Sequence, residues 1–141
     1  MRMLIATGGT GGHIYPAMAL ADAAKERYGD IEILFVGNDD RMEASEVPSH
    51  GYAFQGLHAS GLTGNVFNKC RALLLMMNCY RKACRIIDEF KPDIAIGFGG
   101  YVSAPVMLAA HHKHVATMIH EQNSIVGVSN KMVAKYMDAI V

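Results

Sequence analysis

Residues 3–16 read MLIATGGTGGHIYP, and this stretch decides the fold. Residues 3–6 form a short apolar run typical of a buried strand, and four glycines in five residues follow soon after it. Apolar side chains then recur at helical spacing over residues 16–28. A strand that passes through a glycine-rich turn into a helix is the opening unit of a parallel α/β sheet.

The rest of the chain repeats this alternation of strands and helices. The pattern predicts further helices over residues 66–90, 102–111 and 128–136. It predicts further strands over residues 32–36, 52–57, 93–97, 115–120 and 138–141. Because the strands are almost entirely apolar, both faces of the sheet should be covered by helices. We therefore expect one doubly wound, Rossmann-like α/β domain over residues 1–141.

The composition excludes several classes of protein. With 51% hydrophobic residues and a mean hydropathy of +0.15, the chain is not intrinsically disordered. The 13 basic and 13 acidic side chains give a net charge of zero, which argues against a nucleic-acid partner. There is neither a run of 18 apolar residues nor a signal-peptide pattern, so we expect a location on the cytoplasmic side.

Cysteine and histidine usage favours neither disulfides nor metal. The three cysteines lie within 15 residues and lack C-x-x-C spacing, so we expect reduced thiols. The clustered histidines of residues 111–114 have no neighbouring cysteine or carboxylate pair, and we expect no metal site and no cofactor. The chain ends inside the strand pattern of residues 138–141, which suggests that a partner domain is missing.

Glycine-rich turns follow two predicted strands, at residues 8–12 (GGTGG) and 97–100 (GFGG). Glycine lets the backbone approach a ligand closely, and the following helix N-terminus offers N–H groups to a phosphate. The dinucleotide fingerprint G-x-G-x-x-G is broken at Ile14, and no Lys completes a Walker A motif. Together with the polar residues 120–123 (HEQN), the turns predict an anion-binding crevice at one sheet edge. Tight turns without a ligand and a solvated loop remain the alternatives.

The long helix over residues 66–90 carries two apolar stripes. One stripe predicts the core face and comprises Leu73, Met77, Tyr80, Cys84, Ile87 and Phe90. The other should face away from that core and comprises Leu75, Cys79 and Ile86, preceded by Val66 and Phe67. Residues 66–91 carry a net charge of +4, against −4 for residues 1–65. This helix is therefore either a surface for an anionic membrane or a solvated face with incidental apolar residues.

Five segments together resemble the MurG family of bacterial peptidoglycan N-acetylglucosaminyltransferases. They are GGTGGHIYPAMALA, DRMEASEVPSHGY, SGL at residues 60–62, KPDIAIGFGGYVSAP and IHEQNSIVGVSNK. The resemblance implies the N-terminal, acceptor-binding half of a two-domain GT-B glycosyltransferase. Such an enzyme transfers N-acetylglucosamine from UDP-GlcNAc to the MurNAc C4 hydroxyl of lipid I, giving lipid II with inversion. After HEQN the sequence reads SIVGV, where many members have proline before the glycine.

The resemblance also implies roles for particular residues. His13 is the expected general base, since histidine readily exchanges protons near neutral pH. Donor binding is expected at Thr10, Gly11, Gly12 and Asn123. Binding of the acceptor and its diphosphate is expected at Gly9, Gly99, Gly100, Tyr101, Ser103, His120, Glu121 and Gln122. The expected membrane patch comprises Phe67, Lys69, Arg71, Leu75, Cys79, Arg81, Lys82, Arg85 and Ile86.

The expected partners are UDP-GlcNAc, lipid I, anionic inner-membrane lipids and the protein's own C-terminal domain. The expected location is peripheral, on the cytoplasmic face of the bacterial cell membrane, and this half alone should be inactive. One alternative is half of a nucleotide-binding oxidoreductase, with Asp39 or Asp40 on a ribose, although the broken fingerprint disfavours it. The other is a membrane-anchoring or scaffold subunit of a split glycosyltransferase.

Overall fold

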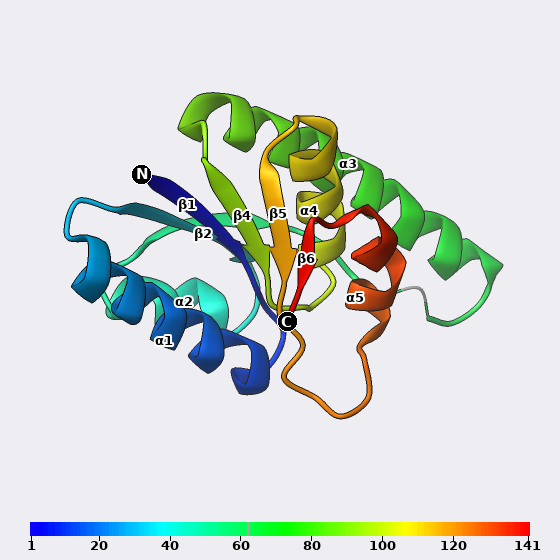
Figure 1. Ribbon diagram of the computed structural model, residues 1–141. Coiled ribbons are helices and arrows are strands. Elements are labelled where there is room, and N and C mark those ends of the chain that lie inside the picture. Colours follow the sequence, from blue (N-terminus) through cyan, green and yellow to red (C-terminus); the bar gives the residue numbers. More distant parts are fainter. Residues whose placement is uncertain (62) are drawn as a thin grey trace.

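Six parallel strands form a sheet at the centre of the molecule (Figure 1). They are β1 (Arg2–Ala6), β2 (Glu32–Asn38), β3 (Ala53–Leu57), β4 (Ile94–Gly97), β5 (Ala116–Ile119) and β6 (Ala139–Ile140). Their order in the sheet is β3-β2-β1-β4-β5-β6. This computed structural model describes residues 1–61 and 63–141. Leu62, the last residue of the SGL motif, lies outside the described residues.

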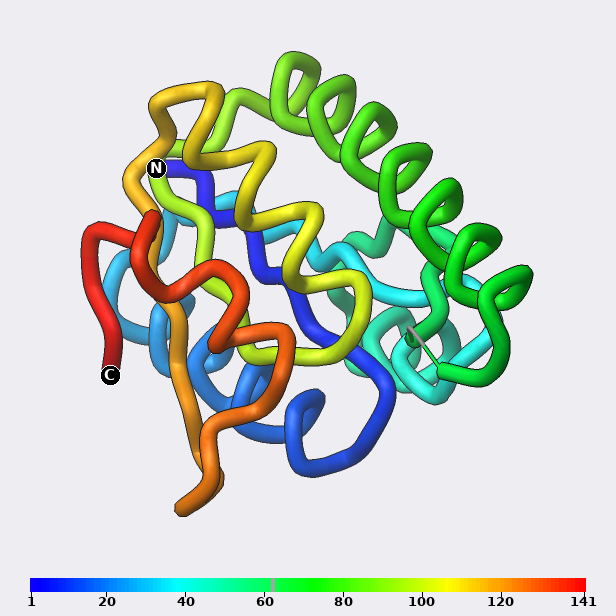
Figure 2. Tube along the Cα trace, turned by 90° about the vertical axis from the view of Figure 1, so that its right-hand side faces the viewer, coloured from blue at the N-terminus to red at the C-terminus, as the bar shows by residue number. Residues whose placement is uncertain are grey.

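Helices cover both faces of the sheet, as the apolar strands predict (Figures 1 and 2). The helices are α1 (Gly11–Tyr28), α2 (Glu43–Ser49), α3 (Val66–Phe90), α4 (Ser103–His112) and α5 (Val128–Val133), the last followed by a 3-10 turn at Ala134–Tyr136. On the central strand, Met3 and Ile5 pack with α1 and α2, whereas Leu4 and Ala6 pack with α3 and α4. The doubly wound α/β fold is therefore confirmed.

The strand order places a crevice between β1 and β4. The chain leaves β1 toward β2 and β3 on one side, then returns to pair β4 with the other side of β1. At such a reversal of strand order, the segments that follow the two adjacent strands diverge to opposite faces of the sheet. The two glycine-rich turns predicted to bind a ligand are the segments that follow β1 and β4.

Two helices differ from the sequence prediction. Helix α1 begins at Gly11, several residues before the expected start at residue 16, so the second pair of glycines lies in its first turn. Helix α2 was not predicted, because its sequence EASEVPS is short, mostly polar and contains Pro48. Its buried side chains are Glu43 and Val47, and Glu43 proves important for the first glycine turn.

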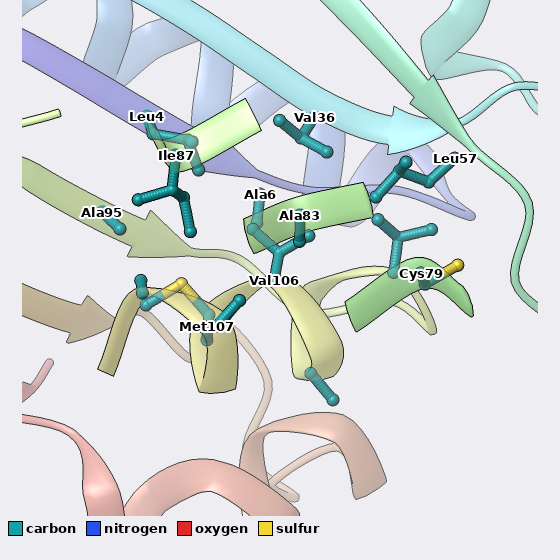
Figure 3. Close-up of a cluster of buried hydrophobic side chains, with 14 of the residues drawn as sticks. Leu4, Ala6, Val36, Leu57, Cys79, Ala83, Ile87, Ala95, Val106 and Met107 are labelled. Atoms are coloured by element: carbon teal, nitrogen blue, oxygen red, sulfur yellow. The ribbon is translucent and has the colours of Figure 1, made fainter. Parts of the chain in front are cut away.

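The buried face of α3 also differs from the prediction. Its buried residues are Ala72, Cys79, Ala83 and Ile87, and Figure 3 shows the last three in one buried cluster with side chains of the sheet and of α4. The stripe assignment was wrong for Cys79, which is 1% exposed and donates to the His58 carbonyl oxygen at 2.9 Å. Burial raises the pKa of its thiol. Ile86, from the same predicted stripe, packs partly buried against this core.

Conversely, two residues of the predicted core stripe are on the surface. Leu73 is 55% exposed and Met77 is 49% exposed. The reason is steric: α3 packs closely on α4 through small side chains, so alanines and a cysteine fill the contact and larger apolar residues face outward.

Candidate functional site

The two glycine-rich turns touch each other at the carboxyl ends of β1 and β4. Gly9, Gly99 and Gly100 all have positive φ angles of 91–97°, a conformation that strains any other residue. A Cβ atom on Gly100 would lie 2.4 Å from the carbonyl oxygen of Gly8. The backbones of the two turns are therefore in direct contact, and only glycine fits at Gly100.

A buried carboxylate braces the first turn. Glu43, the first residue of α2, is 0% exposed. Its Oε1 accepts from the Asn38 N–H at 2.8 Å, and its Oε2 accepts from the Gly9 N–H at 3.1 Å. A Cβ on Gly8 or Gly37 would collide with this side chain, so both glycines make room for it. Glu43 thus joins the end of β2 to the glycine turn.

His13 lies in the first turn of α1 between the two glycine turns. Its Nδ1 is 3.0 Å from the Thr10 hydroxyl, and its ring lies against Gly99, where an added Cβ would come within 3.0 Å of Nε2. In the tautomer with the proton on Nδ1, the ring donates to Thr10 and Nε2 can accept a proton. The fold therefore holds the imidazole at the crevice in an orientation suited to a base.

Glu121 organises the loop between β5 and α5. Its carboxylate accepts four hydrogen bonds of 2.9–3.0 Å, from the backbone N–H groups of Asn123 and Gly127 and the side-chain amides of Asn123 and Asn130. Desolvation acts to raise the pKa of Glu121, but these bonds stabilise the ionised form more strongly and lower it to about 2. Glu121 is therefore an anion that shapes the loop.

A cavity of about 320 Å³ lies where these segments meet. It brings together seven of the residues predicted for the site: Gly9, Thr10, His13, Gly99, Gly100, Tyr101 and Glu121. The wall also contains Gly8, from the predicted glycine turn, and residues that sequence reasoning missed, namely Asn38, Arg41, Gly127, Val128, Ser129 and Asn130. Asn130 is 2% exposed, and its Oδ1 has no hydrogen-bond partner among the described residues.

The other predicted site residues lie beside the cavity and do not line it. Gly11 and Gly12 lie in the first turn of α1, and Ser103 is buried in the first turn of α4. His120 stacks on Phe98 with ring centroids 5.2 Å apart. The remaining two make polar contacts at the crevice edge: Gln122 donates to the Phe98 carbonyl oxygen and Asn123 donates to Glu121.

Three exposed side chains beside the crevice have ligand atoms close enough to hold a metal ion. They are Asp39, Asp40 and His58, whose ligand atoms lie within 4.8 Å of one another. His58 Nδ1 is 3.1 Å from Asp39, and Arg41 is 3.7 Å from Asp40. Exposed acidic groups gather without a metal in many proteins, so this cluster by itself is no evidence of a metal site.

A second feature of interest is the outer surface of α3, here called the α3 surface. Its exposed apolar side chains are Val66, Phe67, Leu73, Leu74 and Met77, of which Phe67 is 76% and Leu74 66% exposed. Its exposed basic side chains are Lys69, Arg71, Arg81, Lys82 and Arg85. Apolar residues spaced by three and four along a helix form one continuous stripe. In the part of the chain that the structure describes, none of the helices has the length and apolar character needed to cross a bilayer.

Known proteins match this chain over nearly its whole length. The glycosyltransferase family 28 N-terminal domain matches residues 3–141. A Cytophaga hutchinsonii protein named UDP-N-acetylglucosamine--N-acetylmuramyl-(pentapeptide) pyrophosphoryl-undecaprenol N-acetylglucosamine transferase is 50% identical over 140 residues. A Limosilactobacillus reuteri protein of the same name is 45% identical over 141 residues. Each match covers 99% of this chain and 38% of the relative.

A solved structure agrees with these matches. The crystal structure of Acinetobacter baumannii MurG superimposes with a TM-score of 0.86 at 26% identity, covering 99% of this chain and 40% of that one. The chain therefore spans about two fifths of the length of the relatives it matches.

Proposed function

Because this chain belongs to the glycosyltransferase family 28 N-terminal domain family, we propose that it is the acceptor-binding half of an inverting N-acetylglucosaminyltransferase. The reaction transfers N-acetylglucosamine from UDP-GlcNAc to the MurNAc C4 hydroxyl of undecaprenyl-diphospho-MurNAc-pentapeptide (lipid I), giving lipid II for peptidoglycan synthesis. The observation that carries the proposal is His13 held between two touching glycine turns, in a chain 50% identical over 99% of its length to a protein named as such a transferase.

In this reaction His13 acts as the general base. Its Nε2 takes the proton of the C4 hydroxyl while that oxygen forms a bond to the anomeric carbon of N-acetylglucosamine. The bond from the anomeric carbon to the diphosphate breaks at the opposite face, and UDP leaves with the electron pair, so the configuration inverts. The hydrogen bond with Thr10 and the contact with Gly99 support this role because they fix the plane of the ring. A positioned base contributes about 10²–10⁴-fold to such a rate.

We assign the donor and the acceptor to different sides of the crevice. Thr10, Gly11, Gly12 and Asn123 lie on the donor side, where the N-terminus of α1 offers N–H groups to a phosphate. The acceptor sugar lies against Gly9, Gly99, Gly100 and Tyr101, with Ser103, His120, Glu121 and Gln122 supporting the segments around it. A C-terminal half of the same protein supplies the uridine contacts, in keeping with the 38% of each relative that this chain covers.

The α3 surface brings the protein to its lipid-linked acceptor. Its apolar stripe enters the headgroup region and its basic side chains attract anionic lipids, so the protein is peripheral on the cytoplasmic face of the bacterial membrane. Support comes from the exposure of Phe67 and Leu74 on the same helix as five exposed arginine and lysine residues. Cys79 and Ile86 do not take part, because they pack against the core.

The test is transfer of labelled GlcNAc from UDP-GlcNAc to a short-chain lipid I analogue by the full-length protein. His13→Ala should lower kcat by about 10²–10⁴-fold with little change in either KM. His50→Ala is the matched control, because His50 is exposed at the end of α2, outside the cavity, and its variant should keep the wild-type kcat.

Either of two results would count against the proposal. An unchanged kcat in His13→Ala would remove the base role from His13. Absence of transfer by the folded wild-type protein would refute the enzymatic function and favour a membrane-anchoring or scaffold subunit.

A further inference from the structure

A second cavity, of about 410 Å³, opens between the glycine-turn site and helix α3. Its wall includes Asn68, Arg71 and Leu75 of α3, together with Arg41 and His58 from the segments that follow β2 and β3. Arg41 and Tyr101 line both this cavity and the glycine-turn cavity. The two cavities are therefore adjacent and share a wall.

The second cavity carries positive charge. Guanidinium groups stay charged at all physiological pH values, and their fork of donors matches the oxygens of a phosphate. Arg41 lies 3.7 Å from Asp40, in a pair with both side chains about half exposed, and His58 lies 3.1 Å from Asp39. Arg71 makes no ion pair with any residue that the structure describes. Arg71 is thus the strongest candidate for an external anion.

The second cavity lies between the α3 surface and His13, as the diphosphate of the acceptor lies between its lipid and its sugar. On one side Leu75 leads to the α3 surface, and on the other side the shared wall leads to His13. The relatives' name places a pyrophosphoryl group between undecaprenol and the sugar. A lipid chain at the α3 surface and a sugar beside His13 would put the diphosphate across the shared wall.

On this basis, and resting on the function proposed above, we propose that Arg71 and Arg41 bind the acceptor phosphate that carries the polyprenyl chain. The glycine turns then contact the phosphate next to the sugar. The two phosphates share one bridging oxygen, and the proposal places one of them on each side of the wall that Arg41 and Tyr101 form between the cavities. Arginine can donate two parallel hydrogen bonds to one phosphate, which adds geometric specificity to the binding energy. Backbone N–H groups donate one hydrogen bond each and carry no full charge.

The donor also contains a diphosphate, and the experiment separates the two sources. In the full-length protein, Arg71→Gln should raise the KM for a short-chain lipid I analogue about tenfold and leave the KM for UDP-GlcNAc within twofold. Arg41→Gln should act in the same direction. Arg27→Gln is the matched control, because Arg27 is exposed near the end of α1 on the opposite face of the sheet and should leave both constants unchanged.

A direct binding probe complements the kinetics. Geranyl diphosphate should bind the wild-type protein at least tenfold more tightly than geranyl monophosphate, and Arg71→Gln should abolish this difference. A KM effect on UDP-GlcNAc instead of the acceptor would assign the arginines to the donor and overturn the proposal. The proposal would also be overturned if Arg71→Gln bound each of the two probes with the same affinity as wild type. If wild type transfers no sugar but shows the Arg71-dependent preference, the proposed function fails and the phosphate site stands.

Discussion

Replacing Glu43 by Gln tests whether a residue outside the glycine motifs holds the site together. The carboxylate receives the Gly9 N–H on both oxygens, at 3.1 and 3.3 Å, and the Asn38 N–H on Oε1 at 2.8 Å. Glutamine has nearly the same shape but only one acceptor oxygen. If that oxygen takes the place of Oε1, the amide NH₂ takes the place of Oε2. It then faces the Gly9 N–H at the 3.1 Å of the former hydrogen bond, so that two donors oppose each other.

The structure sets the size of the expected effect. The Gly9 N–H forms a part-buried bond to an ionised carboxylate, and losing the shorter of its two contacts together with the charge costs about 1.5–3 kcal/mol. A cost of about 2 kcal/mol corresponds to a roughly 30-fold change in a local opening equilibrium. Amide hydrogen exchange at Gly9 should therefore be about 30-fold faster in Glu43→Gln than in wild type. The kcat/KM for sugar transfer should fall together with this protection.

The assay is residue-resolved hydrogen exchange on the full-length protein. Glu46→Gln is the matched control, because Glu46 lies on the same short helix and its side chain makes no hydrogen bond or ion pair within the described residues. Its variant should exchange at Gly9 like wild type. Equal Gly9 exchange rates in the two variants would show that Glu43 does not brace the turn, and the argument from its hydrogen bonds would be wrong.

Two further predictions concern the crevice loop and the α3 surface. The pKa of Glu121 is lowered from 4.5 to about 2, so its contribution to stability is present above pH 4.5 and is lost as the pH falls toward 2. Glu121→Gln should therefore melt below wild type at pH 7, the gap closing toward pH 2 in a calorimetric series, and a gap independent of pH would contradict this. Leu74→Glu should weaken sedimentation with phosphatidylglycerol-rich vesicles at least fivefold, whereas Tyr28→Glu, exposed at the end of α1, should not. Equal binding by both variants would refute the membrane role of α3.

Much of the fold follows from the sequence because buried strands of a parallel sheet are short, apolar and separated by clear breaks. Helix α3 has the predicted bounds, since Pro92 and a long periodic pattern define it. Its buried face was not predictable from hydropathy. Close packing against α4 selects small side chains such as Ala72 and Ala83, and the size of a side chain then matters more than its polarity.

The site was predictable only where glycine patterns and strand ends mark it. Both glycine turns and His13 lie at the cavity as expected, because carboxyl ends of neighbouring parallel strands must meet at one edge. Arg41 and Asn130 were missed. They come from a polar segment and from a short helix, and nothing in their local sequence indicates that the chain folds back to the crevice there.

The glycine motifs alone do not define this site, because two carboxylates outside them control its shape. Glu43 fixes the turn after β1, and Glu121 fixes the loop after β5 through four hydrogen bonds. A sequence that keeps both glycine turns but loses either carboxylate retains the recognisable pattern and loses the hydrogen bonds that hold the turn after β1 or the loop after β5. The shape of the crevice therefore depends on residues that glycine patterns do not include, and Arg41 and Arg71, which line the adjacent cavity, also lie outside those patterns.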